Sequence, residues 1–597
     1  MNILKAEENN FENFLFYDIE VFAEDAIAVF KDINGKTQRV YHNNFHGLRE
    51  FIKGKVLVGY SNYHYDDYIL TAMMRGDDVY KIKFLNDSII QEELHWNNVD
   101  SDIFSLDCFQ QINVAKSSLK KVEANIGLSI DESKVDFEID RALRPDEVID
   151  TIKYCKQDVN ATIAIFKLRW KSYFIPKIMI VKMLPKEIRF KALRWNTTTI
   201  TANILTGNVP VKQWDFWQLG DGVFDNEEML FIVPEEVVEM WQNPEEKKKY
   251  TQYDFDCAIE FSQGGLHGVP VNNVKKYRDV KLLDVTSLYP NILIKLNALG
   301  KATEKYKQIV EKRVKVKHTD PILSNALKLV INSTYGLMKN QYSKLYNPMG
   351  ALSVCIFGQI ALYDLCQRLY TAGYTLISIN TDGVAFNGGN QTFDIENGYD
   401  YEVVWREWEE DYGLSLELSE FETWIQKDVN NYVAEYKNGG IKVKGAEVNH
   451  YFDPVDYLDD PLNLNAGVNW TGTNTKGIIN KCIVDKLLYG HEFLDTILNN
   501  LDNPILFQYV LQCGNTFIGT IDENGKMYQK VNRVFATKKG VTLKKKKEGF
   551  NPQYFPNAPE NMYVYNGDLR EFDNFKEIVD VDFYNNLARE KYEKLWV

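Results

Sequence analysis

The stretch SINTDGVAF, residues 378–386, sets two short apolar runs on either side of Asn380-Thr381-Asp382-Gly383. An Asp-Gly pair between alternating apolar residues predicts a β-hairpin, because the turn needs a positive φ that Gly, Asn and Asp adopt at little cost. Carboxylates in turns are common and are usually only solvated. The stretch by itself therefore predicts a hairpin and leaves a chemical role for Asp382 open.

The length and composition are those of a large globular protein. The chain has 597 residues, of which 45% are hydrophobic, and domains usually contain about 100–200 residues, so several domains are expected. The seven cysteines include no C-x-x-C pair and no cluster beside a His. This pattern indicates neither a zinc site nor a disulfide framework, and we therefore expect the protein to work in a reducing compartment. The N-terminal residues do not form a signal peptide, and no run approaches the ~18 apolar residues of a membrane span. We expect a soluble, cytoplasmic protein without membrane contact.

The net charge of −15 argues against a surface coated with nucleic acid, but a groove depends on local charge. Residues 526–547 contain nine Lys or Arg and no acid, and residues 301–347 contain ten basic and three acidic residues. Both segments are candidate tracks for phosphates. The alternative for each is a solvated charged face.

Two acids interrupt an apolar segment near the N-terminus. In NFLFYDIEVF (residues 13–22), the period of a strand places Asp18 and Glu20 on one face. Side by side on an apolar strand, these carboxylates repel each other and lose hydration, and a divalent cation would relieve both costs. The alternative is a strand end that lies in water.

Two further segments complete a pattern. An apolar strand at residues 55–59 leads to Asn62, Tyr65 and Asp66, and a segment with helical spacing at residues 146–166 sets Tyr154 and Asp158 one turn apart. The order D-x-E, N-x-x-Y-D and Y-x-x-x-D resembles the three motifs of the DEDD-type 3′–5′ exonuclease domain, in its tyrosine subclass.

This resemblance implies a role for each residue of the pattern. Four carboxylates would hold two Mg²⁺ ions through oxygen ligands: Asp18, Glu20, Asp66 and Asp158. Tyr154 would orient the water that attacks the terminal phosphodiester. Asn62 and Tyr65 would steady the frayed 3′ end of the DNA.

The remaining two thirds of the chain contain a second ordered set. KLLDVTSLYPNILIK (residues 281–295) begins as an apolar strand that ends at Asp284 and then turns toward a helix. In NALKLVINSTYGLMKN (residues 325–340), helical spacing places Lys328, Asn332 and Tyr335 on one face. Followed by T-D-G at Asp382, these segments resemble motifs A, B and C of family B DNA polymerases.

The polymerase resemblance implies a second two-metal site. Asp284 and Asp382 would bridge the metals, with Val285 as a further metal-binding residue. Lys328 would neutralise the triphosphate, helped by Arg313 and Lys317 on an opposing fingers helix. Tyr289 occupies the steric-gate position that excludes a 2′-OH. The other residues expected at the nucleotide are Ser287, Leu288, Asn332 and Tyr335.

Two departures and several looser matches accompany these motifs. Motif C usually reads D-T-D, and here Asn380 replaces the first acid, which in the family acts mainly from outside the metal shell. Asn430 likewise stands where a Lys is usual, before Tyr432. The looser matches predict contacts to DNA through backbone glycines or cations: Gly264, Gly265, Tyr432, Lys442, Lys444, Lys538 and Lys539.

The expected fold is a mixed α/β and α+β multidomain protein, with an RNase H-like exonuclease domain followed by a right-hand polymerase. The expected domains are exonuclease 1–185, first palm part 186–300, fingers 301–344, second palm part 345–450, and thumb with C-terminal region 451–597. Asp284 and Lys328 are separated by 44 positions and Tyr335 and Asp382 by 47, which leaves little room for the insertions of protein-primed relatives.

The expected function is replicative DNA synthesis with proofreading in a phage-like element, in the host cytoplasm. The expected cofactor is Mg²⁺, two ions per site, with Mn²⁺ as a substitute. The expected partners of the monomer are primer-template DNA and dNTPs, with a single-strand-binding protein, a helicase or a processivity factor as candidates. Two alternatives stay open, namely an exonuclease with a decayed polymerase half and a non-catalytic DNA-binding replication factor.

Overall fold

The computed structural model describes residues 11–92, 99–111, 118–207, 232–242, 249–271, 276–388, 400–445, 447–448 and 475–597. The chain divides into two compact units. The first contains residues 1–196, 450–482 and 492–590, and the second contains residues 197–449, 483–491 and 591–597. This division is coarser than the five expected domains, which stay a prediction.

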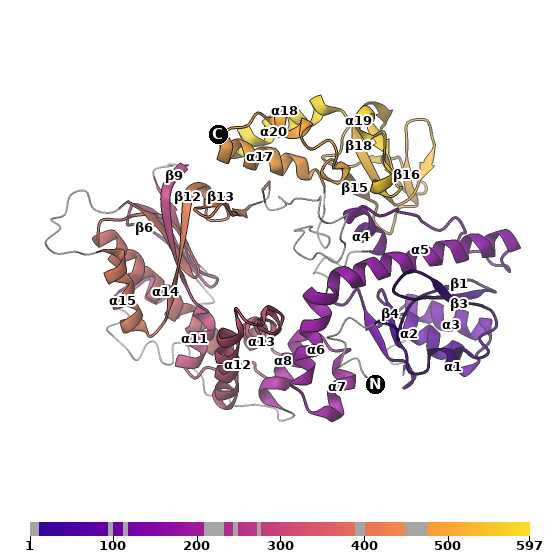
Figure 1. The fold of residues 1–597 in the computed structure, drawn as a ribbon, viewed down its shortest axis with the longest axis horizontal. Helices are drawn as coiled ribbons and strands as arrows, with labels where there is room; N and C mark the ends of the chain where they lie inside the picture. Colours follow the sequence, from indigo (N-terminus) through magenta and orange to yellow (C-terminus); the bar gives the residue numbers. More distant parts are fainter. Residues whose placement is uncertain are drawn as a thin grey trace. The chain divides into compact units, whose positions relative to one another are not determined.

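The N-terminal part of the first unit is built on a five-stranded sheet in the order β3-β2-β1-β4-β5. Figure 1 labels β1, β3 and β4 of this sheet. Strand β1 pairs antiparallel with β2 and parallel with β4. The strands are β1 (Phe14–Val21), β2 (Ala26–Lys31), β3 (Thr37–His42), β4 (Val56–Gly59) and β5 (Ser105–Asp107). In β1, aromatic and aliphatic residues are buried while Asp18 and Glu20 are half-buried, which confirms that the strand exists and that both acids share one face.

Helices cover this sheet, and the longest of them confirms the predicted helical spacing around Tyr154 and Asp158. Helix α5 (Pro145–Arg169) packs along β1 and β2, as Figure 1 shows. It begins with Pro145 in its first turn, where a missing N–H costs nothing. The other helices are α1 (Leu48–Ile52), α2 (Asp66–Arg75), α3 (Val79–Ile90), α4 (Leu119–Asn125), η2 (Trp170–Phe174), α6 (Ile175–Lys182) and α7 (Lys186–Ala192).

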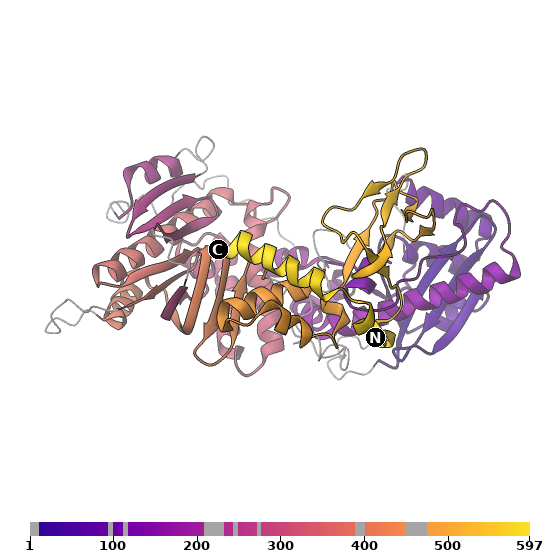
Figure 2. The same cartoon turned by 90° about the horizontal axis from the view of Figure 1, so that it is seen from above.

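The C-terminal residues add two small sheets, which Figure 2 shows in orange and yellow. One has the order β15-β18-β21 and the other β17-β16-β19-β20. Their strands are β15 (Tyr509–Gln512), β16 (Gly519–Ile521), β17 (Met527–Tyr528), β18 (Val531–Val541), β19 (Lys544–Lys546), β20 (Gln553–Tyr554) and β21 (Met562–Val564). The helices are α17 (Gly477–Tyr489), α18 (Phe493–Leu498), η5 (Pro504–Leu506), η6 (Leu569–Glu571), α19 (Phe575–Ile578) and α20 (Val581–Trp596). Strands β15 and β18 pack against α4 of the same unit.

The second unit is built on an antiparallel sheet of nine described strands in the order β14-β13-β12-β9-β11-β10-β8-β7-β6. The predicted hairpin is confirmed, because β10 and β11 pair antiparallel on either side of residues 381–382. The strands are β6 (Lys249–Asp254), β7 (Cys257–Ser262), β8 (Gly265–Pro270), β9 (Lys276–Val285), β10 (Thr375–Asn380), β11 (Gly383–Asn387), β12 (Leu416–Asp428), β13 (Asn431–Tyr436) and β14 (Ile441–Lys444).

Helix α14 (Pro348–Thr371) is the core helix of the second unit and packs on β8, β10 and β11. By length and composition it could cross a membrane, so the expectation that no run approaches a membrane span is wrong for this segment. However, 89% of its most apolar window is buried, as in the central helix of a globular core. The other helices are α8 (Thr197–Thr206), α10 (Glu235–Gln242), α11 (Leu288–Lys295), η3 (Gly300–Ala302), α12 (Thr303–Val316), α13 (Pro321–Lys339) and α15 (Tyr401–Tyr412).

Candidate active sites

Asp284 and Asp382 meet at the centre of the second unit's sheet. Asp284, near the end of β9, lies opposite Gly383 of β11, and the Val285 amide donates to the Asp382 carbonyl oxygen over 2.6 Å. Both acids line a cavity of about 160 Å³ together with Asn380, Tyr432 and Lys442. Two strands that are distant in sequence thus bring two carboxylates to one point.

The electrostatics of this cavity favour a cation. Burial, opposed by Lys442 and assisted by the carboxylates of Asp382 and Glu417, raises the pKa of Asp284 to about 6. Partial burial also raises the pKa of Asp382, although the residue as a whole is exposed. Lys442, which was predicted to contact the primer backbone, therefore lies at the acidic pair in this structure.

The turn between β10 and β11 differs from the predicted one. The positive φ, 47°, falls on Thr381, a β-branched residue, and not on Asn380, Asp382 or Gly383. For such a residue this conformation is strained. It is held by a 2.8 Å hydrogen bond from the Thr381 amide to the Leu266 carbonyl oxygen. Gly383 is needed for another reason, because a Cβ there would lie 2.1 Å from Asp284 Oδ1.

Of the two glycines after β7, Gly265 lies against this turn and Gly264 does not. A Cβ on Gly265 would lie 2.9 Å from Thr381 Cγ2, and the φ of Gly265 is 129°. Gly264 is exposed, and a Cβ there would meet only Ser262 Oγ at 3.6 Å. Close approach to the Asp382 turn thus accounts for Gly265, and a contact between these glycines and DNA stays a prediction.

Two tyrosines lie side by side near the start of α11. The rings of Tyr289 and Tyr335 are 4.8 Å apart between centroids. The Tyr289 hydroxyl lies 3.6 Å from Cys355 Sγ, and the Tyr335 hydroxyl donates to the Ala351 carbonyl oxygen over 3.2 Å. The two predicted nucleotide contacts from different helices are therefore brought together. Leu288, also predicted there, is buried in α11.

The predicted basic residues lie on α12, at its end, and on α13. Arg313 donates to Ser287 Oγ over 3.3 Å, and Ser287 has a strained φ of 52°. Lys317 forms a 2.7 Å ion pair with Glu417, the residue opposite Asp284 on β12. Lys328 and Asn332 are exposed on α13 one turn apart, as their spacing predicted.

In the first unit, β1 and α5 bring three carboxylates together. Oxygen atoms of Asp18, Glu20 and Asp158 all lie within 4.8 Å of one another. Burial, followed by the Asp158 carboxylate, raises the pKa of Asp18 to about 7. Burial and then Asp18 also raise the pKa of Glu20 and of Asp66. Tyr154 hydrogen-bonds to Asp158.

Asp66 and Asp67 are adjacent in sequence but interact with different groups. Asp67 is fully buried and bonds to the Arg194 guanidinium over 2.7 Å, to Ser105 Oγ over 2.6 Å and to the Tyr17 hydroxyl. Its role is structural, and Asp66 is left to interact with Asp18. Asn62 donates to Asp67 over 3.2 Å and is fully buried, so a contact with a DNA end requires that residue to be uncovered. Tyr65 donates to Asn86 over 2.6 Å.

Two residues of this site were missed from the sequence. Lys120, on α4, places its Nζ 2.5 Å from Asp158 Oδ1 and 4.6 Å from the centre of the Tyr154 ring. Glu123, one turn later, has its carboxylate 3.4 Å from the same ammonium and is fully buried. The available signal was a Lys and a Glu three positions apart on a short helix, behind the N-cap Ser118.

The basic residues at 526–547 differ in their exposure to solvent. Lys538 and Lys539 are exposed on β18, where Lys538 pairs with Asp582 over 2.9 Å. Arg533 in the same run is fully buried, so the expectation that the whole run forms a phosphate track is wrong for this residue.

The remaining residues predicted to contact DNA lie on the second unit. Lys444 is the last residue of β14, and the Tyr432 ring stacks on Trp424 with 4.7 Å between ring centroids. Asn430 is exposed in the turn between β12 and β13.

The donor sets of both sites fit divalent metals. Asp18, Glu20 and Asp284 are half-buried carboxylates whose pKa values are raised by burial and by neighbouring acids, and burial also raises the pKa of Asp382. A hard cation such as Mg²⁺ binds oxygen ligands and would remove both penalties.

No protein-family model and no curated protein matches the sequence. The chain is similar in structure to the family B DNA polymerase from the hyperthermophilic archaeon Pyrobaculum calidifontis, with 14% sequence identity and a TM-score of 0.41. The match covers 98% of this chain and 78% of that one.

Proposed function

We propose that this chain is a DNA-directed DNA polymerase that extends a primer 3′-OH and trims mispaired 3′ ends with a separate exonuclease. The observation that carries the proposal is the pair of Asp284, near the end of β9, and Asp382, in the turn that leads into the neighbouring strand β11. Both line one cavity, and Asp284 lies opposite Glu417, which is ion-paired to Lys317 at the end of the basic helix α12. Nucleotidyl transfer requires this combination of a two-carboxylate metal site and cations for phosphates.

Asp284 and Asp382 would hold Mg²⁺, or Mn²⁺ in its place. When bound, such ions activate the primer hydroxyl and stabilise charge on the phosphates. The side chains of this chain have their own tasks. Lys328, Arg313 and Lys317 would bind the triphosphate, and Lys317 must first leave Glu417. Tyr289 would lie beneath the sugar and exclude a 2′-OH.

The exonuclease half of the proposal rests on the acidic cluster of the first unit. Asp18, Glu20 and Asp158 would hold metals of the same kind, and Asp66, which is near enough to raise the pKa of Glu20, would complete the set. Tyr154, which hydrogen-bonds to Asp158, would orient the attacking water. Lys120 would hold the Asp158 carboxylate in place and offset one negative charge.

The finer proposal is a family B enzyme of phage-like type that replicates DNA in a cytoplasm and starts from a nucleic-acid primer. It rests on the order of the sequence motifs and on the short spacings around Asp284, Lys328 and Asp382. The substrates would be primer-template DNA and dNTPs, bound by a monomer.

A single assay tests both halves. With Mg²⁺ and dNTPs, the purified chain should extend a labelled primer on a template, and without dNTPs it should shorten the primer from its 3′ end. Chelation of the metal by EDTA should stop both reactions. Absence of extension together with absence of trimming would reject the proposal.

The second candidate is a 3′–5′ exonuclease whose polymerase half has decayed, which the replacement at Asn380 favours. Under that reading the chain trims primers with Mg²⁺ but never extends them. Extension at any measurable template-dependent rate excludes it.

A further inference from the structure

The exonuclease cluster receives Lys120 from a helix that the C-terminal residues hold in place. Helix α4 (Leu119–Asn125) begins at Ser118, whose hydroxyl accepts from the Lys121 amide. Lys120 leaves the helix toward Asp158. The loop that follows α4, residues 126–132, lies against residues of the C-terminal sheets, and this contact belongs to the first unit.

Arg533 is the centre of that contact. It lies on β18, 409 residues after Ala124, and its guanidinium donates to the carbonyl oxygens of Ala124 over 3.2 Å and Leu128 over 2.8 Å. The same side chain donates to the Gly567 carbonyl oxygen over 2.7 Å and to Gln508 Oε1 over 2.9 Å. One side chain thus joins the end of α4 to two C-terminal segments.

Arg533 is fully buried. Burial lowers its pKa to about 10, so the side chain stays charged at neutral pH. A buried charge is costly unless all its donors are matched. Its planar fork suits several acceptors at fixed angles, which a lysine ammonium on a flexible stem does not reproduce.

Further bonds fix the loop in the same place. The Glu132 carboxylate accepts from the amides of Lys530 and Val531 at 2.9 and 3.0 Å. The Ile130 amide donates to the Asn566 carbonyl oxygen over 2.7 Å, and the Leu569 amide donates to Gly127 over 2.9 Å.

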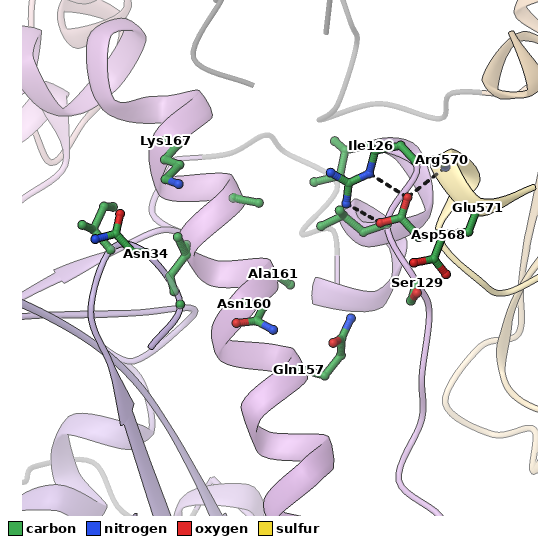
Figure 3. Close-up of a pocket in the computed structure, with 15 residues that line it drawn as sticks. Asn34, Ile126, Ser129, Gln157, Asn160, Ala161, Lys167, Asp568, Arg570 and Glu571 are labelled. Atoms are coloured by element: carbon green, nitrogen blue, oxygen red, sulfur yellow. Dashed lines mark hydrogen bonds and ion pairs between the residues drawn. The ribbon is translucent and has the colours of Figure 1, made fainter. Parts of the chain in front are cut away.

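The junction borders a cavity of about 360 Å³. Figure 3 shows Ile126 and Ser129 from the loop beside Asp568, Arg570 and Glu571, with α5 across from them. Asp568 and Arg570 are joined by an ion pair there.

From these contacts we propose that Arg533 is a positioning residue for the exonuclease centre. By anchoring α4 it sets Lys120 against Asp158, so that the C-terminal part of the chain governs hydrolysis at carboxylates of the N-terminal part. The inference rests on the proposed exonuclease function. Because Arg533 is fully buried and its hydrogen-bond partners include none of the cluster carboxylates, its effect passes through α4, which carries Lys120.

The test compares Arg533→Lys, Lys120→Ala and the double variant for trimming of a single-stranded primer with Mg²⁺. Loss of a group that orients a metal ligand typically costs about 10- to 100-fold in activity, and we expect Arg533→Lys to lower kcat by that factor with KM unchanged. The double variant should trim no slower than Lys120→Ala alone, because Arg533 then has nothing left to position.

Lys121→Ala is the matched control on the same helix, since within the described residues its hydrogen bond to the Ser118 side chain comes from the backbone amide; it should trim like the unmodified chain. Thermal unfolding and primer extension check that each variant is folded. If Arg533→Lys does not fold, Glu132→Ala loosens the same junction from the α4 side and should reproduce the fall in kcat.

Losses that multiply in the double variant would overturn the proposal, because they show that Arg533 acts independently of Lys120. Unchanged trimming by folded Arg533→Lys, or by Glu132→Ala where that variant replaces it, would overturn it as well. Failure of the proposed function is distinguishable, because then the unmodified chain does not trim at all.

Discussion

Asp382 and Asn380 flank a single strained residue, Thr381, and this arrangement permits a test at the scale of one turn. Asp382→Asn removes a charged ligand from the cavity, so primer extension should fall by several orders of magnitude because transition-state charge is poorly neutralised. Asn380→Asp should leave extension within about tenfold, or ~1.4 kcal/mol in barrier. Single-turnover extension rates measure both.

The two substitutions are nearly equal in size, so each controls for disturbance of the turn by the other. Steady extension by Asp382→Asn with loss of extension by Asn380→Asp would reverse the assignment. Small and equal effects of both substitutions on extension would mean that residues 378–386 form a hairpin without a role in catalysis.

Tyr289 supports a second prediction at this scale. Replacement by Val removes the ring that packs beside Tyr335, so the preference for dNTP over NTP should fall by orders of magnitude, at ~1.4 kcal/mol per tenfold. Tyr289→Phe keeps the ring and loses only the contact of the hydroxyl with Cys355, and should retain the preference. Competition between dNTP and NTP in primer extension measures it, and equal selectivity in all three enzymes would place the gate elsewhere.

At the scale of elements, the hairpin of β10 and β11 depends on the neighbouring turn of β7 and β8. Gly265→Ala puts a Cβ 2.9 Å from Thr381 at a φ of 129°, and such strain costs on the order of 1–3 kcal/mol. We expect a lower melting temperature and slower extension. Gly264→Ala is the neighbouring control for stability, since its Cβ meets nothing closer than 3.6 Å. Equal melting temperatures for the two variants would contradict the argument.

Helix α6 contains a buried cation that weakens the fold at neutral pH. Lys177 is 2% exposed, and burial, followed by repulsion from Arg169, lowers its pKa from 10.5 to about 7. Between these two values the unfolded chain binds a proton that the folded chain has lost, so the penalty is largest below pH 7 and disappears as pH approaches 10.5.

Lys177→Met should therefore raise the free energy of unfolding by ~1–4 kcal/mol at pH 7. Loss of the hydrogen bond from Lys177 to Gln110 offsets part of this gain. The gain should shrink as pH rises toward 10.5. Lys171→Met, at an exposed position one residue into η2, should show no such trend. Chemical unfolding across this pH range measures the difference, and a pH-independent gain would contradict the assigned pKa.

At the scale of the whole molecule, the two acidic sites belong to different units of the chain. Asp18→Ala combined with Asp66→Ala should abolish 3′ trimming without dNTPs while extension persists. Asp284→Ala should do the reverse, and each variant is the control for the other. Trimming of a single-stranded primer at the unmodified rate by the double variant would remove the exonuclease assignment.

Local patterns of the sequence determined the elements that carry both sites. The period of two predicted β1 with Asp18 and Glu20 on one face, and the helical period predicted α5 and α13. The Asp-Gly pair predicted the hairpin that ends near Asp382. These features depend on residues close in sequence, so the chain itself encodes them.

Only the tertiary structure decided which polar groups meet. Buried Asp67 pairs with Arg194, whereas its neighbour Asp66 lies with the acidic cluster. Arg533, which was expected to contact phosphates, is buried and hydrogen-bonds to the end of α4. The tertiary structure also moved the strained φ from the Asp-Gly pair to Thr381, because the backbone of Gly265 and Leu266 approaches there. Each outcome depends on desolvation and on hydrogen bonds between distant segments, and neither has a sequence period to reveal it.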